Sequence, residues 1–180
     1  MRMEIEAKLK VESHEEIIKE LVQLGAEFLQ EQMQTDYYFD DANRTLTETD
    51  RCLRLRRLQA DQTEKIFLTY KGAREKDNFK KRQEIEVEVK GVDSAEKLLS
   101  ALGYEKALVF EKRRRIWRLS RCEIALDELS LLGSFVEIEG PDDGRIADVQ
   151  RSLGLAGLPH IPKSYATLVA EKLHQQNSRQ

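Results

Sequence analysis

The stretch Met3-Glu-Ile-Glu-Ala-Lys-Leu-Lys10 alternates strictly between apolar and charged residues. Because successive side chains of a β-strand point to opposite faces of the sheet, this pattern predicts a strand with one apolar and one charged face. The charged face carries Glu4, Glu6, Lys8 and Lys10. Such a strand needs an apolar partner on one side and a polar environment on the other.

The same alternation recurs along the rest of the chain, in long segments typical of antiparallel strands. These further strands are predicted near residues 27–40, 51–58, 64–71, 81–90, 106–119, 122–129 and 133–139.

Helices are predicted between the strands, near residues 14–24, 94–102, 142–153 and 164–175. Ser13 with Glu16 has the spacing of a capping box, and Ser164 is a typical N-cap. Gly25, Gly103 and Gly154 each follow a predicted helix, where glycine commonly ends it.

A chain of 180 residues is in the size range of one domain, which we place at residues 1–175. Residues 74–80 are predicted to form an exposed loop, and residues 176–180 a disordered tail.

The composition excludes several classes of function. The 30 lysine and arginine residues nearly balance the 33 aspartate and glutamate residues, for a net charge of −3, so nothing global favours nucleic acid or anionic membranes. No apolar run approaches the roughly 20 residues of a membrane span, and the N-terminus lacks a signal-peptide pattern, so we expect a cytoplasmic protein. Cys52 and Cys122 lack metal-site spacing and are expected to be free thiols.

Like charges share a strand face repeatedly, as in the pairs Arg54 with Arg56 and Glu137 with Glu139. For a single strand, a solvated charged face is the simpler explanation. Like charges two positions apart repel, however, unless an opposite charge lies between them. Acidic pairs favour Mg²⁺ or Mn²⁺, and basic pairs favour phosphate. If the sheet closes into a barrel, these faces would line an internal ligand tunnel.

Two common phosphate-binding motifs, G-x-x-x-x-G-K-[ST] and G-x-G-x-x-G, do not occur in the sequence. Phosphate would therefore have to be held by side chains.

An ordered series of motifs matches a known family. The motifs are Glu4-x-Glu6-x-Lys8, Gln34-x-Asp36-x-Tyr38-Phe39, Leu53-Arg-Leu-Arg56, Leu68-Thr-Tyr-Lys71-Gly72, Arg82-x-Glu84-x-Glu86, Lys112-x-Arg114 with Ile116-Trp117, and Leu126-Asp127-Glu-Leu129 through Phe135-Val-Glu137-Ile-Glu139. On these residues the chain, from Glu4 to about Tyr165, resembles the CYTH superfamily of triphosphate tunnel enzymes. The resemblance implies an α+β fold: a closed antiparallel eight-stranded β-barrel, the triphosphate tunnel, with helices packed on the outside.

The resemblance also implies roles for individual residues, with structural ion pairing as the alternative for each. The expected phosphate-binding residues are Lys8, Arg54, Arg56, Lys71, Arg82, Lys112 and Arg114. The expected ligands of Mg²⁺ or Mn²⁺ are Glu4, Glu6, Asp127, Glu137 and Glu139, with Glu84 and Glu86 either joining them or pairing with basic residues. Lys8, Lys71 and Asp127 are the candidates for catalysis. Arg113 and Arg115 have the opposite parity and are placed outside the tunnel.

Members of this superfamily include class IV adenylyl cyclases, thiamine triphosphatases and inorganic triphosphatases. The spacing of residues 126–139 and of Lys163-Ser164-Tyr165 is more similar to the cyclase branch, which implies conversion of ATP to cyclic AMP and pyrophosphate. The alternatives are hydrolysis of inorganic or thiamine triphosphate and, third, a non-catalytic module that binds nucleotides or polyphosphate. Phe39, Phe67 and Phe135 are candidates for stacking on a base, although core packing explains each of them as well. An apolar outer barrel face would permit a homodimer.

Overall fold

The computed structural model describes residues 2–74 and 80–178, except for the side chains of residues 2–4, 80 and 81. Its strands are β1 (Arg2–Val11), β2 (Glu27–Asp40), β3 (Cys52–Ala60), β4 (Thr63–Lys71), β5 (Lys80–Val89), β6 (Glu105–Leu119), β7 (Cys122–Leu129) and β8 (Gly133–Glu139). Its helices are α1 (Glu15–Gln23), α2 (Thr45–Glu48), α3 (Val92–Ala101), α4 (Asp143–Ser152) and α5 (Tyr165–Asn177).

The strands pair side by side in the order β1-β5-β4-β3-β2-β6-β7-β8. All neighbours are antiparallel, and β1 pairs with both β5 and β8, so the circuit of pairings closes into a barrel. The predicted α+β class with eight antiparallel strands is confirmed. Their bounds agree closely with the alternating segments of the sequence, because a period of two is a local property of a half-buried strand.

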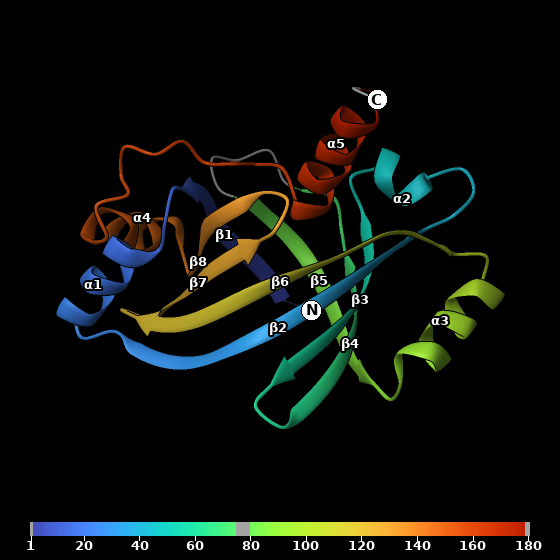
Figure 1. Ribbon diagram of the computed structural model, residues 1–180, viewed down its shortest axis with the longest axis horizontal. Helices are drawn as coiled ribbons and strands as arrows, with labels where there is room; N and C mark the ends of the chain where they lie inside the picture. The colour runs from blue at the N-terminus through green and yellow to red at the C-terminus, as the bar shows by residue number, and fades with distance from the viewer. Residues whose placement is uncertain (1, 75–79, 179–180) are drawn as a thin grey trace.

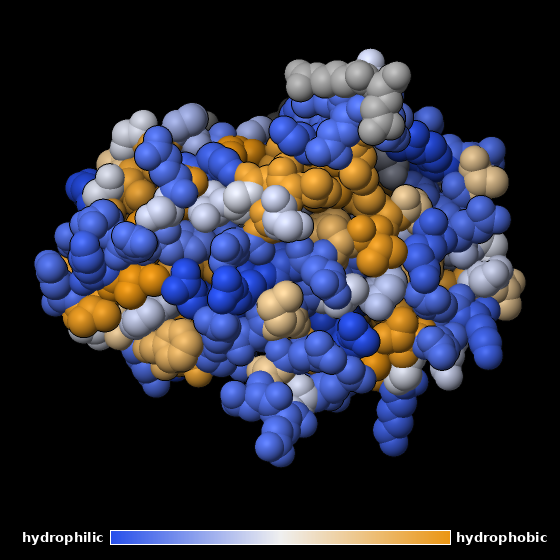
Figure 2. Space-filling view, in the orientation of Figure 1, coloured by the Kyte–Doolittle hydropathy of each residue, from blue (hydrophilic) through white to orange (hydrophobic). Residues whose placement is uncertain are grey.

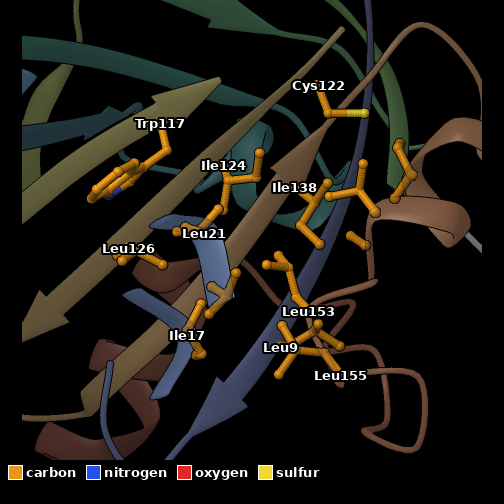
Figure 3. Close-up of a cluster of buried hydrophobic side chains, with 14 residues drawn as sticks. Leu9, Ile17, Leu21, Trp117, Cys122, Ile124, Leu126, Ile138, Leu153 and Leu155 are labelled. Carbon is orange, nitrogen blue, oxygen red and sulfur yellow. The ribbon is translucent and has the colours of Figure 1, made fainter. Parts of the chain in front are cut away.

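The largest hydrophobic core lies between the outer face of β1, β7 and β8 and the helices α1 and α4 (Figure 1). Figure 3 shows Leu9, Ile124 and Ile138 of the barrel facing Leu21 of α1 and Leu153 after α4. Burying one such side chain stabilises the fold by about 1.5–3 kcal/mol. The apolar faces of these strands therefore point outward, which leaves the charged faces to the interior.

A second core lies under α3, where Leu99 packs with Phe39, Leu55 and Ile66 of three neighbouring strands. Helices α1, α3 and α4 thus cover the outside of the barrel, as expected. Helix α5 differs, because it lies with α2 at one end of the barrel, where both contribute residues to an internal cavity (Figure 1). The face drawn in Figure 2 is mostly hydrophilic, and hydrophobic residues gather on it around the start of α5.

Helix α2 was not predicted, because four residues show no helical periodicity. Its first turn is held by Asp40, whose carboxylate accepts hydrogen bonds from the backbone N–H groups of Leu46 and Thr47, each at 2.9 Å. The carboxylate also accepts one from the Thr47 hydroxyl at 2.6 Å.

The start of α1 differs from the predicted capping box. Its N-cap is His14, and Ser13 Oγ accepts a hydrogen bond from the backbone N–H of Glu15 at 3.2 Å. The His14 ring is buried, with Nε2 2.9 Å from the carbonyl oxygen of Phe135. The predicted helix ends are confirmed at Gly25 and Gly103, whose φ values of 71° and 88° favour glycine.

The remaining predictions concern termini, loops and cysteines. Helix α5 continues to Asn177, two residues past the predicted limit of 175, while residues 75–79 of the predicted loop and 179–180 of the predicted tail lie outside the described part. Cys52 and Cys122 are free thiols, as predicted. Within the described ranges, no helix has both the length and the apolar character that a membrane crossing requires.

Candidate functional site

The barrel contains a cavity of about 1140 Å³ whose lining includes many charged side chains. The strand alternation places them there, and all predicted site residues except Glu4 and Asp127 belong to the lining. The lining includes Glu6, Lys8, Arg54, Arg56, Lys71, Arg82, Glu84, Glu86, Lys112, Arg114, Glu137 and Glu139. The side chain of Glu4 lies outside the described part of the chain.

Arg54 and Arg56 of β3 project into this cavity from adjacent inward positions. Arg56 is held by Asp36 of β2, its register partner, through hydrogen bonds of 2.5 Å from Nε and 2.7 Å from Nη2. Burial alone would raise the pKa of Asp36, but Arg56 and then Arg54 outweigh it and hold that pKa well below its ordinary value. Asp36 is therefore a buried counterion that fixes the guanidinium of Arg56 in the cavity wall.

Asp36 gives the protein a predictable dependence on pH. A carboxyl group whose pKa is depressed by folding stabilises the protein fully above its unfolded pKa near 4 and loses that contribution as the pH falls toward the folded pKa. At pH 7 we expect Asp36→Asn to lower the free energy of unfolding by about 1.5–3 kcal/mol. The gap to wild type should narrow below pH 4 by up to about 1.4 kcal/mol per unit. Urea unfolding at pH 7 and pH 3 measures this, and a constant gap would contradict the assignment.

Asp127 of β7, a predicted metal ligand and catalytic residue, has two basic partners inside the barrel. It is fully buried and does not line the cavity. One carboxylate oxygen accepts from Arg114 Nε at 2.6 Å, and the other accepts from Lys112 Nζ at 2.9 Å and from Arg114 Nη2. Burial opposes ionisation, but Arg114 and Lys112 outweigh it and lower the pKa of Asp127. Its carboxylate is thus the internal counterion of two phosphate-binding candidates in this structure, and its roles in metal binding and catalysis stay predictions.

The charge of Lys112, another cavity residue, depends on its buried surroundings. Burial, followed by the positive charge of Arg114, lowers the pKa of Lys112 to about 7. Asp127 and Glu137 oppose this change. An anion that enters the cavity would favour the charged form of the lysine by the same electrostatic attraction.

The acidic residues Glu84 and Glu86 of β5, predicted either to bind metal or to pair with basic residues, have partners in the cavity wall. Glu84 lies 2.9 Å from Lys71 Nζ. Glu86 accepts a hydrogen bond from Thr69 at 2.8 Å and lies 3.8 Å from Arg54. Both glutamates therefore pair with neighbouring groups of the wall in this structure.

Some buried polar atoms at the cavity lack a hydrogen-bond partner among the described residues. They include Arg54 Nε, a donor, and Gln34 Oε1, an acceptor. Buried polar groups without partners are uncommon in folded proteins, and a binding site is one physical explanation. The donor in particular suits an anionic ligand beside Arg54.

The family comparison agrees with this geometry. The family model described as CYTH domain matches residues 2–165.

The chain belongs to the CYTH family.

A Methanocaldococcus jannaschii protein named "Putative adenylate cyclase" is 31% identical over 137 residues, which are 76% of this chain and 76% of that one. The solved structure of the PH1819 protein from Pyrococcus horikoshii has a TM-score of 0.81 at 31% identity and covers 94% of this chain and 99% of its own. A Vibrio parahaemolyticus structure described as "a putative adenylate cyclase" has a TM-score of 0.76 at 24% identity, with 94% and 98% covered, and supports the fold alone.

The carboxylates of the CYTH tunnel have donor chemistry that suits Mg²⁺ or Mn²⁺. Glu6 of β1 and Glu139 of β8 are register partners, and both line the cavity. Glu137 lies 3.2 Å from Lys8 Nζ and also contacts Arg114. Among the described side chains, no group of three or more acidic, histidine or cysteine residues is arranged to hold a metal. The residues fit a Mg²⁺ or Mn²⁺ ion that would keep waters and substrate phosphates as further ligands.

Several residues of the CYTH tunnel were not assigned a role from the sequence. Gln32 shares the inward parity of Gln34 and Asp36, so the alternation of β2 was a usable signal. The pair of Asp50 and Arg74 gave no such signal. Arg74 Nε lies 2.9 Å and 2.8 Å from the two Asp50 oxygens, and this pair joins a turn after α2 to the end of β4.

The three aromatic candidates for base stacking occupy different environments. Phe135 is buried in the cluster with Tyr165, at a ring-centroid distance of 5.2 Å. Phe39 is buried in the core under α3, although it also borders the cavity. Phe67 is half-buried and lines the cavity. Core packing therefore accounts for Phe135, and Phe67 is the candidate that the structure leaves accessible from the tunnel.

Proposed function

We propose that this CYTH chain is a metal-dependent enzyme that acts on the triphosphate group of a nucleotide and converts ATP to cyclic AMP and pyrophosphate. The observation that carries this proposal is the convergence of basic side chains from five strands on one cavity. These side chains are Lys8, Arg54, Arg56, Lys71, Arg82, Lys112 and Arg114.

The cavity has the size and the charge for a nucleoside triphosphate. Its volume of about 1140 Å³ is slightly larger than that of typical small-molecule sites, which span about 300–1,000 Å³. Arginine supplies forked hydrogen bonds to phosphate oxygens, and lysine supplies a compact charge. Apolar lining such as Leu58 and Leu108 adds a surface that a bare phosphate chain would not need. This combination favours an organic triphosphate.

In the proposed reaction the ribose 3′-hydroxyl loses its proton to water as its oxygen attacks the α-phosphorus. The new ester bond forms, and the bond to the pyrophosphate oxygen breaks with its electron pair left on pyrophosphate. The basic residues would bind the β- and γ-phosphates and neutralise the charge that develops on the leaving pyrophosphate. Lys8 and Lys71 are the lysines that we propose for the reacting phosphates. A divalent ion held at Glu6 and Glu139 would supply further charge neutralisation on the phosphate oxygens.

The metal proposal predicts a selective effect of Glu139→Gln. The amide keeps the shape of the side chain but lacks the charge that a divalent ion prefers, while Glu6 and the phosphates remain as ligands. We expect metal-dependent turnover to fall by about 10- to 100-fold, a loss of roughly 1.4–2.7 kcal/mol of transition-state stabilisation. Affinity for tripolyphosphate in metal-free buffer should not decrease. Full turnover in the variant would contradict the metal assignment, and Glu128→Gln on the outer face is the matched control.

Hydrolysis of the terminal phosphate is the second candidate. The cavity offers many charged groups that could bind phosphate but few groups that could recognise a base. Two of the three aromatic candidates for base recognition are buried in hydrophobic clusters, which favours a reaction that needs only the phosphate chain. The same cations would serve an attacking water at the γ-phosphorus.

One assay separates these reactions. The purified protein is incubated with ATP, inorganic triphosphate or thiamine triphosphate, each with Mg²⁺ or Mn²⁺, and the products are identified. Cyclic AMP with pyrophosphate supports the cyclase, and orthophosphate supports the hydrolase. Tight binding without turnover of any of the three would contradict both and indicate a binding module.

A further inference from the structure

Residues 160–165, which precede and begin α5, run along β1 at the position of Lys8. In the described part of the chain, β1 pairs with β5 only as far as Glu6 opposite Lys80. Beyond that point His160 forms a β-bridge with Leu9, and the backbone N–H of Ile161 donates a 2.8 Å hydrogen bond to the carbonyl oxygen of Lys8. The segment before α5 is thus fixed to the strand that carries Lys8.

This attachment places Tyr165, the first residue of α5, against two lysines of the tunnel. Lys8 Nζ lies 4.1 Å from the centroid of the Tyr165 ring, and Lys112 Nζ lies 4.6 Å from it. Lys8 Nζ also donates a hydrogen bond to the carbonyl oxygen of Lys163 at 3.2 Å. Both lysine side chains are almost completely buried, and Tyr165 is only 5% exposed.

The contact solves an electrostatic problem of the tunnel. Lys8 and Lys112 each have a carboxylate partner, Glu137 and Asp127 respectively, but their two buried ammonium groups still repel each other before an anion arrives. The face of an aromatic ring attracts a cation, and the attraction is larger when the cation is desolvated. A ring that contacts both groups therefore favours the charged, inward arrangement of both lysines.

We propose that Tyr165 is a positioning residue of the triphosphate site, whose ring holds the ammonium groups of Lys8 and Lys112 where they meet the phosphates. This inference rests on the proposed function. Helix α5 is then part of the phosphate site as well as a cover at the end of the barrel. The position of α5 is set by the packing of Tyr165 and Val169 with Phe135. These residues belong to a hydrophobic cluster that is separate from the two cores described above.

The test compares two substitutions that differ in the ring. Tyr165→Leu keeps an apolar side chain but removes the π face, whereas Tyr165→Phe keeps the face. The measurement is the dissociation constant for inorganic tripolyphosphate by titration calorimetry in metal-free buffer. We expect Tyr165→Leu to weaken binding about tenfold and Tyr165→Phe to stay within about threefold of wild type.

Two controls separate positioning from folding. Val169→Ala removes a contact of the same cluster without touching either lysine, and should leave tripolyphosphate affinity unchanged even if thermal unfolding shifts downward. In a Lys112→Met background, the Tyr165→Leu penalty should shrink to about threefold, because one of the two cation contacts is already absent.

The outcomes distinguish this inference from the function on which it rests. If wild type does not bind tripolyphosphate, the proposed function fails and this inference fails with it. If wild type binds but Tyr165→Leu binds equally well, the positioning role alone is overturned. It is also overturned if Tyr165→Phe is as weak as Tyr165→Leu, or if the full penalty persists without Lys112.

Discussion

Replacement of Asp127 with alanine is expected to lower the free energy of unfolding by about 3–5 kcal/mol. The carboxylate is fully buried and neutralises Lys112 and Arg114, both inside the barrel. Its removal leaves two buried cations without their main counterion, and Glu137 is the acidic neighbour that still contacts Arg114. Urea unfolding at pH 7, with the slope of the transition compared between variants, measures the loss.

The adjacent residue provides a matched control. Glu128 forms an ion pair with Arg113 at 2.9 Å, but both side chains are about half exposed. An exposed pair contributes about 0–1 kcal/mol, so Glu128→Ala should be nearly neutral. Equal decreases in the free energy of unfolding for Asp127→Ala and Glu128→Ala would contradict the view that burial makes the Asp127 ion pairs more stabilising than the exposed pair.

The sequence predicted most of this fold because the signals are local. In β3 the alternation of Leu53 and Leu55 with Arg54 and Arg56 already separates an outer apolar face from an inner basic face. The polarity of each residue indicates which face of the sheet its side chain occupies. The strand bounds and the inward-facing positions can therefore be predicted from a period of two.

The partners of the charged residues could not be predicted in the same way. Asp127 has the inward parity of a tunnel residue, yet its carboxylate accepts hydrogen bonds from Lys112 and Arg114 on the neighbouring strand. The alternation along a strand indicates that a side chain points inward. Whether that side chain reaches the cavity or pairs with a neighbouring strand depends on the register between the strands. The contacts of Tyr165 depend on where α5 lies, which no local pattern encodes.

The second large effect is expected for Arg54→Ala, which should lower kcat/KM on the accepted triphosphate by about 100- to 1,000-fold, or roughly 2.7–4 kcal/mol. Arg54 is buried, lines the cavity and has a guanidinium Nε without a hydrogen-bond partner among the described residues. Its other described contacts, Thr69 at 3.3 Å and Glu86 at 3.8 Å, are long, so the fork is not saturated by the protein.

Steady-state kinetics on Arg54→Ala, Arg54→Lys and Arg57→Ala tests this role. Arg57 is on the same strand but has the opposite parity and does not line the cavity, so its loss should change kcat/KM by less than about threefold, within the roughly 0.5 kcal/mol of an ordinary surface change. Arg54→Lys keeps a charge but not the fork, and should recover only part of the activity because lysine cannot bind a phosphate through two parallel hydrogen bonds. Full recovery by lysine would mean that Arg54 acts as a point charge. Equal losses for Arg54→Ala and Arg57→Ala would mean that the effect comes from the stability of β3, and the inward face would then have no special part in catalysis.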